Sequence, residues 1–386
     1  MAKLGNICEI AAGQGAPQGE NSYCNCNEGI PFIKAGDLSD LLSGKLETEI
    51  QCVNEIVAKQ HKLKLYPAGS ILFAKSGMSC MKGYVYRTKN PCYIVSHLAI
   101  VIPQGIDGEY LKYYFQHNKP NALIKDSAYP SISLQDISNI ELTVPSLDIQ
   151  ASIASELNKV NMLISFRKQQ LSKLDELVKS RFIEMFGEPE SNPLHWAMLP
   201  LEKCLTVLGG YAFKSEEFKT SGVPVLRIGN INTGVFTPTN MVYWAEDASL
   251  ERYQVLPGDL VISLTGTVGK DDYGNVCILG NTYPLYYLNQ RNAKLILGES
   301  LNKHYLSELL KFSHIKKKLT GISRGVRQAN ISNRDILNLV VPIPPIELQT
   351  QFATFVEQTD KSKFEIQKSL EKLETLKKAL MQKNFR

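Results

Sequence analysis

The feature that most constrains the fold is a passage that occurs twice in the chain. ISLQDISNIELTVPSLDIQ begins at Ile132, and ISNRDILNLVVPIPPIELQ begins at Ile331. The two passages match without a gap, and matched residues such as Ser133 and Ser332 lie 199 positions apart, the difference between 332 and 133. Because one sequence pattern favours one local structure wherever it occurs, the chain is expected to fold as two similar halves.

Weaker similarities extend the repeat toward the start of each half. LGNICEIAAG from Leu4 resembles LEKCLTVLGG from Leu201, and AGSILFAKSG from Ala68 resembles PGDLVISLTG from Pro257. Small insertions change the offset, but the order of the features is kept. The period is far longer than the repeats of solenoid proteins. The sequence therefore predicts the duplication of a whole domain together with a connecting element.

Composition indicates a protein without membrane contact. A chain of 386 residues can form two or three domains, each with its own core. The first residues, MAKLGNICEI, contain no long apolar run, and no stretch approaches the roughly eighteen apolar residues of a membrane span. We therefore expect a cytoplasmic protein.

The cysteines do not have the spacing of a metal site. There are eight in the chain, and the only close pair, Cys24 and Cys26, has no matching pair or histidine cluster beside it. We expect reduced thiols and no bound metal.

Short apolar runs bounded by Gly, Pro and Asn predict strands in both halves. These runs cover residues 30–33, 70–73, 99–102, 223–228 and 259–263. Apolar residues at helical spacing predict helices over residues 109–116 and 303–311. The S-x-x-D pattern at Ser133 and Ser332 is typical of a capped helix start. Each half is therefore predicted to contain a mixed α and β module.

A heptad pattern without internal proline or glycine follows each module. It predicts two helices of about 35 to 40 residues, each about 50 to 60 Å long. The apolar positions are Leu157, Val160, Ile164, Leu171, Leu174 and Val178 in the first copy, and Val356, Ile366, Leu370, Leu373 and Leu380 in the second. Such a narrow stripe cannot bury itself, so we expect the two helices to pair as a coiled coil. If they pair antiparallel, they form a rigid rod with one module at each end. The alternative is that each helix lies on its own module.

Two similar modules at a fixed distance suit a polymer with a repeating surface, such as DNA. Arg, Lys, Asn and Gln can contact base edges, while Ser, Thr and glycine amides can hold phosphates. The candidate DNA-binding residues in predicted loops are Lys34, Lys75, Ser76, Lys82 and Tyr129 in the first module, and Arg227, Asn230, Thr265, Lys270, Arg324, Arg327 and Gln328 in the second. A solvated surface charge is the alternative role for each basic residue. The formal net charge is only +5, so a DNA-binding face requires clustering in space.

The repeated I-S-x-x-D-I, the prolines of VPIPPIELQ and the long heptad helix together resemble the specificity subunit of type I restriction-modification enzymes. The resemblance spans the chain and implies four segments. These are a target recognition domain at 1–146, a helical repeat at 147–190, a second recognition domain at 191–345 and a second helical repeat at 346–386.

This resemblance implies an α+β fold with pseudo-twofold symmetry, in which the two helices form an antiparallel coiled coil. It also implies that each recognition domain binds one half of a split sequence in double-stranded DNA. The helices would dock two methyltransferase subunits, which carry S-adenosylmethionine and methylate adenine. Restriction subunits, which use ATP and Mg, would complete the assembly. This chain itself would hold no cofactor and perform no catalysis.

The chain departs from the family pattern in two respects. The first copy has SLD where the second has PPIEL, and charged residues interrupt the heptad stripe at Arg167, Arg181, Lys363 and Lys377. These charges either weaken the coil or bind methyltransferase subunits. Recognition domains of this family vary freely, so no base contact is transferred from the family to this chain.

Two other classes of protein are alternatives. A methyltransferase would need an N/D-P-P-F/Y segment, and an ATPase would need a P-loop; the sequence contains neither. A coiled-coil scaffold that binds other proteins through duplicated modules would explain the heptads equally well. The unlike segments after the similar cores, MSCMKGYVY and TVGKDDYGN, favour the reading of two different half-sequences.

Overall fold

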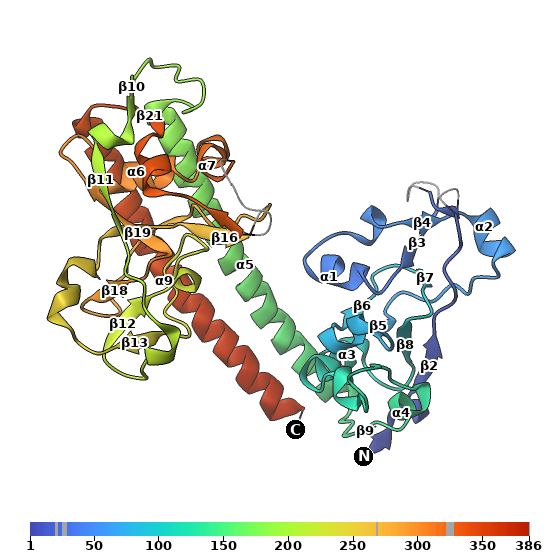
Figure 1. The fold of residues 1–386 in the computed structure, drawn as a ribbon. Coiled ribbons are helices and arrows are strands. Elements are labelled where there is room, and N and C mark those ends of the chain that lie inside the picture. Colours follow the sequence, from blue (N-terminus) through green and yellow to red (C-terminus); the bar gives the residue numbers. More distant parts are fainter. Residues whose placement is uncertain (20–21, 25–28, 268, 322–327, 386) are drawn as a thin grey trace. The chain divides into compact units, whose positions relative to one another are not determined.

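The computed structural model describes residues 1–19, 22–24, 29–267, 269–321 and 328–385. It divides into two compact units: Met1–Lys168 with Lys368–Arg386, and Gln169–Gln367. Each unit contains one mixed α/β module and parts of both long helices (Figure 1).

The first module is built on an antiparallel sheet with the strand order β2-β8-β5-β6. Its strands are β2 (Cys8–Ala12), β5 (Ile71–Ala74), β6 (Tyr86–Arg87) and β8 (Leu98–Pro103). A smaller sheet, β4-β3-β7, contains β3 (Ile30–Ile33), β4 (Cys52–Val53) and β7 (Tyr93–Ile94), and β1 (Ala2–Lys3) pairs with β9 (Glu141–Leu142). The short helices are α1 (Asp37–Leu42), α2 (Glu55–Gln60), α3 (Gly108–His117) and α4 (Leu134–Ser138).

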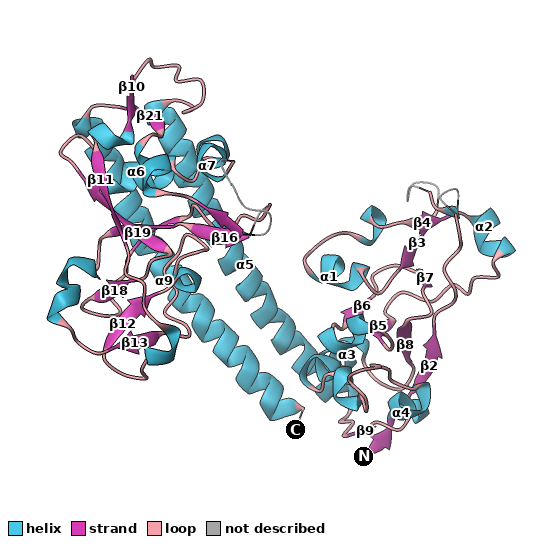
Figure 2. Ribbon diagram, viewed as in Figure 1, coloured by secondary structure: helices cyan, strands magenta, loops and turns pink. Residues whose placement is uncertain are grey.

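The second module repeats this topology. Its main sheet has the order β11-β19-β15-β17, with β11 (Leu205–Gly209), β15 (Leu260–Ser263), β17 (Val276–Ile278) and β19 (Asn292–Leu297). The second sheet, β13-β12-β18-β14, contains β12 (Val223–Leu226), β13 (Val242–Trp244), β14 (Gln254–Val255) and β18 (Tyr286–Leu288). Two further pairs are β10 (Ala197–Pro200) with β21 (Val340–Ile343), and β16 (Thr265–Thr267) with β20 (Gln328–Asn330). The helices are α6 (Lys303–Leu309), α7 (Ser313–Thr320) and α8 (Asn333–Leu337), and Figure 2 shows the sheets and helices of both modules.

One glycine of the repeated pattern has the same role in both modules. A Cβ atom on Gly13 would lie 2.2 Å from the carbonyl oxygen of Val95, and one on Gly210 would lie 2.2 Å from the carbonyl oxygen of Asn289. Both glycines directly follow the first strand of the main sheet, where the chain crosses a neighbouring segment. This close backbone approach explains why AAG and LGG end the two similar passages.

The predicted strands and short helices are confirmed, with small differences at their ends. The predicted strand over 223–228 ends at Leu226, because the Arg227 N–H donates to the side chain of Asn230 and a short 3₁₀ turn begins. The predicted helix over 303–311 ends at Leu309. The caps form as expected: Ser133 Oγ accepts the N–H of Asp136, and Ser332 Oγ accepts the N–H of Asp335.

The two long helices are α5 (Leu147–Phe186) and α9 (Ile346–Asn384). Lys168 Nζ lies 3.6 Å from Glu374 Oε1 in the first unit, and Lys363 Nζ lies 2.7 Å from Asp175 Oδ1 in the second. The start of α5 therefore accompanies the end of α9, and the end of α5 accompanies the start of α9. The helices pair antiparallel, and the predicted architecture of two mixed modules with paired long helices is confirmed.

A glycine ends α5. The helix stops at Phe186, and Gly187 follows in a left-handed conformation with φ of +78°. Glycine adopts this conformation without a side-chain clash. All eleven predicted heptad residues are buried or half-buried in the structure.

A repeated glutamine attaches each long helix to its own module. Gln150 Oε1 accepts the N–H of Asp107, the cap of α3, while its amide donates to the Pro145 carbonyl. In the second copy, Gln349 Oε1 accepts the N–H of Asn302, the cap of α6. Both side chains are buried, with 1% and 0% exposure.

Each module also packs against the far end of the other copy's long helix. In the second unit, Phe186 at the end of α5 lies 4.8 Å from Tyr305 on α6, between ring centroids. In the first unit, Phe385 follows α9 and lies 5.1 Å from Tyr110 on α3. Asn118 Nδ2 donates to the carbonyl of Phe385 at 3.1 Å. Phe186 and Phe385 are matched residues of the repeat, and so are Tyr110 and Tyr305.

The prediction of reduced thiols is correct for six cysteines and wrong for Cys52. Cys8, Cys80, Cys92, Cys204 and Cys277 are free, and the Cys24 thiol donates to the Cys52 carbonyl at 3.6 Å, whereas Cys52 is disulfide-bonded. Cys24 pairs with Cys52 through backbone hydrogen bonds of 2.9 and 3.3 Å, a long-range pairing that the spacing of cysteines did not reveal. Cys26 lies outside the described residues. Among the described residues, no helix combines the length and the hydrophobicity of a membrane span.

Candidate nucleic-acid interface

An equivalent turn follows β5 in the first module and β15 in the second. After β5, Lys75 donates its N–H to the His97 carbonyl at 2.9 Å; after β15, Leu264 donates its N–H to the Arg291 carbonyl at 2.8 Å. The next residue pairs with the segment before α4 or α8, as Ser76 with Ser131 and Thr265 with Asn330. Ser131 and Asn330 are themselves 199 positions apart, so the two turns occupy the same place in the repeat.

In the first module this turn presents several of the predicted residues. Lys75 is half-buried, and Ser76 Oγ lies 2.8 Å from His97 Nδ1. Gly77 donates its N–H to the carbonyl of Pro130, and Tyr129 beside it is 82% exposed. The neighbouring Lys82 is exposed as well. The structure therefore brings Lys75, Ser76 and Tyr129 together around one turn.

In the second module the matching turn is a two-stranded ribbon, β16 with β20. Asp272 holds its shape: Oδ1 accepts the N–H of Thr267 at 2.8 Å, and Oδ2 accepts Thr267 Oγ1 at 3.0 Å. The Thr267 N–H lowers the pKa of Asp272. A Cβ on Gly266 would lie 2.3 Å from Asp272 Oδ1, so glycine is required there. Thr265 is half-buried on this ribbon.

Lys270 follows the ribbon and is exposed. Gln328 begins β20, where it pairs with Thr267 through the backbone. The predicted residues Arg324 and Arg327 lie outside the described residues.

A second pair of predicted residues, Lys34 and Arg227, follows β3 and β12. Lys34 Nζ lies 4.3 Å from the centroid of the Tyr23 ring, and the Arg227 guanidinium lies 5.9 Å from that of Phe218. Lys34 borders an open pocket of about 520 Å³ that also contains Tyr23 and Gln51. Both modules thus hold a cation over an aromatic ring at the same place.

The structure gives Asn230 a structural role in place of the predicted base contact. Its side chain is 3% exposed. Oδ1 accepts the Arg227 N–H, and Nδ2 donates to the carbonyls of Thr237 and Thr239. Both amide hydrogens are engaged within the module, so Asn230 stabilises the turn, as Asp37 does in the first copy by accepting the Lys34 N–H.

Two exposed residues of the interface were missed by sequence reasoning. His97 and Arg291 precede β8 and β19, and each stands beside the turn described above. Arg291 borders a pocket of about 350 Å³ with Thr265, Thr267 and Asp272. The isolated sequence gives no signal for them, because their position depends on which strands pair.

A larger groove of about 1110 Å³ lies in the second unit between the end of α5, α7 and the loop before β17. Five lysines line it: Lys179, Lys270, Lys311, Lys316 and Lys317. Lys316 pairs with Asp271, and Lys311 pairs with Glu308. Within the described residues, no group of three or more His, Cys, Asp or Glu side chains is arranged to hold a metal ion.

The long helices carry exposed apolar side chains outside the stripe that joins them. On α5, Met162 is 51% exposed, Leu163 is 44% exposed and Phe166 is 52% exposed. These three residues lie on neighbouring turns of one helix. On α9, Phe364 is 65% exposed. Exposed apolar residues that cluster on a helix are typical of a protein contact.

Comparison with known proteins gives one consistent family. The model described as type I restriction modification DNA specificity domain matches residues 1–176 and 193–378. The type I restriction enzyme MjaVIII specificity subunit of Methanocaldococcus jannaschii is 25% identical over 374 residues, covering 91% of this chain and 84% of that protein. The EcoKI specificity subunit of Escherichia coli K12 is 22% identical, covering 92% and 82%.

The fold is also similar to a solved structure. The crystal structure of the type I restriction-modification S subunit from M. genitalium aligns with a TM-score of 0.60 at 14% identity. The alignment covers 100% of this chain and 95% of that one. At this identity the similarity concerns the fold.

Proposed function

Because the chain belongs to the family of type I restriction-modification DNA specificity subunits, we propose that it reads a two-part DNA sequence with one module for each half-site. The observation that carries this proposal is the pairing of equivalent turns with unlike side chains. Lys75 stands where the second module has Leu264, and Tyr129 matches Gln328 by the offset of the repeat. One frame with different residues suits the reading of two different half-sites.

Phosphate contacts would supply much of the affinity. Lys34, Lys75 and Lys82 in the first module, and Lys270 with the lysine-lined groove in the second, offer cations for this role. Binding that depends on such contacts weakens as salt rises, because the release of counterions from DNA becomes less favourable at a higher salt concentration. Arg227 belongs to the same proposed surface. Arg324, Arg327 and Gln328 are proposed DNA contacts on the basis of the sequence.

The same proposal gives the paired helices two tasks. Their length would set the unread gap between the half-sites, and their exposed apolar residues would dock two methyltransferase subunits. Met162, Leu163 and Phe166 are the proposed contact on α5. Burying a side chain of this size on a partner contributes about 1.5 to 3 kcal/mol.

In this assembly the chain is a non-catalytic subunit. The methyltransferase subunits would carry S-adenosylmethionine, and restriction subunits would supply ATP-dependent cleavage with Mg. The segments 1–146 and 191–345 would read DNA, while 147–190 and 346–386 would act as spacers.

The test is to map methylated adenines in cells that express the chain with its methyltransferase, beside cells that lack only this chain. We expect a split methylated motif that disappears without the chain. A second strain, in which residues 1–146 are replaced by another recognition domain, should change one half of the motif and leave the other. A methylation pattern that is indifferent to the chain would refute the proposal and favour the scaffold alternative.

A further inference from the structure

The turn that the two modules share identifies one equivalent position in each. Ala74 and Ser263 are the last residues of β5 and β15, and they pair with Leu98 and Asn292, respectively. The residues just before these partners, His97 and Arg291, accept the first backbone hydrogen bond after each strand. His97 and Arg291 therefore occupy the same site in the repeat, by register and by hydrogen bond.

The surroundings of these two residues are alike in kind. Both side chains are exposed, and each stands beside a hydroxyl residue of the turn. His97 Nδ1 lies 2.8 Å from Ser76 Oγ, while Arg291 shares a pocket with Thr265. Among the described residues, none forms an ion pair with the Arg291 guanidinium.

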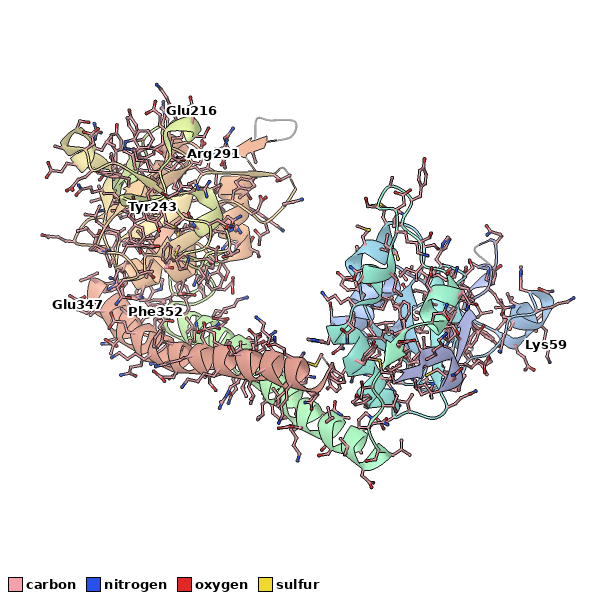
Figure 3. All side chains as sticks on the ribbon, turned by 90° about the horizontal axis from the view of Figure 1, so that it is seen from below. Lys59, Glu216, Tyr243, Arg291, Glu347 and Phe352 are labelled. Atoms are coloured by element: carbon pink, nitrogen blue, oxygen red, sulfur yellow. The ribbon has the colours of Figure 1, made fainter. Side chains whose placement is uncertain are left out.

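Arg291 also has a rigid support. Its backbone N–H donates to Asn289 Oδ1 at 3.3 Å, and its carbonyl accepts from Leu264. The adjacent ribbon is held by Asp272, both of whose oxygens accept from Thr267. The side chain thus projects from a fixed backbone, and Figure 3 marks it on the second module. Such a fixed guanidinium is suited to a planar partner with two neighbouring acceptors.

We propose that positions 97 and 291 are equivalent base-reading positions and that Arg291 reads a guanine in the half-site of the second module. The inference rests on the proposed function. Guanine presents O6 and N7 in the major groove, and an arginine fork binds both at once. The imidazole of His97 has one ring nitrogen engaged with Ser76, so it offers a single remaining nitrogen to a base. The two modules would then differ in specificity at the same place.

The experiment is to map adenine methylation with Arg291→Ala, Arg291→Gln and a matched control, Arg252→Ala. Arg252 is an exposed arginine of the same module, outside the proposed interface. In Arg291→Ala, we expect the preference for guanine at one position of one half-site to fall by about 5- to 150-fold. The other half-site and the control motif should be unchanged. His97→Arg should alter only the other half-site.

The outcomes separate this inference from the proposed function. If the unaltered chain directs no split motif, the proposed function fails, and the inference fails with it. If Arg291→Ala keeps the full motif, the inference alone is overturned.

Loss of all methylation in Arg291→Ala is resolved by Arg291→Gln and by the melting temperature of each variant, because glutamine keeps a polar side chain but pairs with adenine rather than guanine. A folded Arg291→Gln that methylates the original motif without relaxation would show that Arg291 does not read the guanine and would also overturn the inference. Relaxation at one position would support it.

Discussion

Gln150 and Gln349 show how one repeated side chain joins a long helix to a short helix of its own module. Each accepts the N–H of a helix cap and donates to a proline carbonyl before its own long helix. A buried polar group that loses its partner costs about 1 to 3 kcal/mol. The conspicuous glutamine of the repeated passage is thus explained by hydrogen bonding within each unit.

Replacing Gln349 with leucine should lower the free energy of unfolding by about 2 to 4 kcal/mol. The change leaves the N–H of Asn302 and the carbonyls of Ser300 and Pro344 without their partner. Urea denaturation of the purified chain measures the effect. Gln351→Leu, at an exposed position of the same helix, is the control and should change the free energy by less than about 0.5 kcal/mol. Equal effects would refute the role of Gln349.

His304 makes the stability of the second unit depend on pH. Burial lowers the pKa of His304, and nearby Lys303 lowers it further, although Glu357 opposes the shift from 3.4 Å. Because the folded pKa lies below the unfolded value, the unfolded chain binds the proton more readily. The contribution of neutral His304 is therefore complete above the ordinary pKa of 6.5 and is lost as pH falls below it.

In His304→Leu, the free energy of unfolding should fall less between pH 7.5 and pH 5 than in the unaltered chain. Denaturation curves at the two pH values measure this difference. His61→Leu replaces an exposed histidine and should keep the original pH dependence. An unchanged dependence in His304→Leu would show that other groups are responsible.

At the scale of elements, the ends of the long helices are parts of the module cores. Phe182 is fully buried on α5 and lies 4.9 to 5.5 Å from Phe186, Tyr305, Phe312 and Phe352. Phe352 belongs to α9 and is labelled in Figure 3. A segment that would serve only as a spacer thus also contributes to folding.

Phe182→Ala should lower the free energy of unfolding of the second unit by about 3 to 5 kcal/mol, through lost burial and a new cavity. Ile183→Ala provides the comparison, because Ile183 is 36% exposed on the next position of the helix. Thermal unfolding followed by circular dichroism reports both. A similar melting temperature for the two variants would contradict this view of α5.

The charges that interrupt the heptad stripe have different surroundings. Lys363 pairs with Asp175 on α5, and the Arg181 guanidinium lies 5.9 Å from the Phe355 ring on α9. Lys377 is half-buried, and this burial lowers its pKa. Two of the four charges, Lys363 and Arg181, therefore help to join the two helices. The sequence had suggested that such charges either weaken the coil or bind a partner subunit.

The elements that sequence predicted well are those with local signals. The heptad spacing and the caps at Ser133 and Ser332 lie within a few residues of the helices that they specify. The ribbon of β16 and β20 joins segments about sixty residues apart, so Arg291 beside it was missed. Asn230 was predicted to contact DNA because an asparagine amide can bind a base. In the structure, the same amide forms hydrogen bonds that stabilise a turn.

At the scale of the whole molecule, the proposed spacer role predicts a change in the recognised sequence. Seven extra residues in both α5 and α9 add about 10 Å to each helix, or about three base pairs of DNA. Matching insertions should lengthen the unread gap of the methylated motif by that amount.

An insertion in α5 alone should shift α5 along α9, separate Asp175 from Lys363 and abolish assembly. A seven-residue insertion after the exposed Gly44 is the control. An unchanged gap in the double insertion would refute the spacer role.

The contact of Phe385 with Tyr110 and Asn118 has a consequence for synthesis. The first module is translated before the second, but one wall of its aromatic cluster is supplied by Phe385, which follows the second module in the sequence. The first module therefore leaves the ribosome before this wall has been made, and its aromatic cluster is completed only after synthesis of the second module. Truncation of the chain before Phe385 should expose the first module to proteases, although the truncation lies beyond the second module.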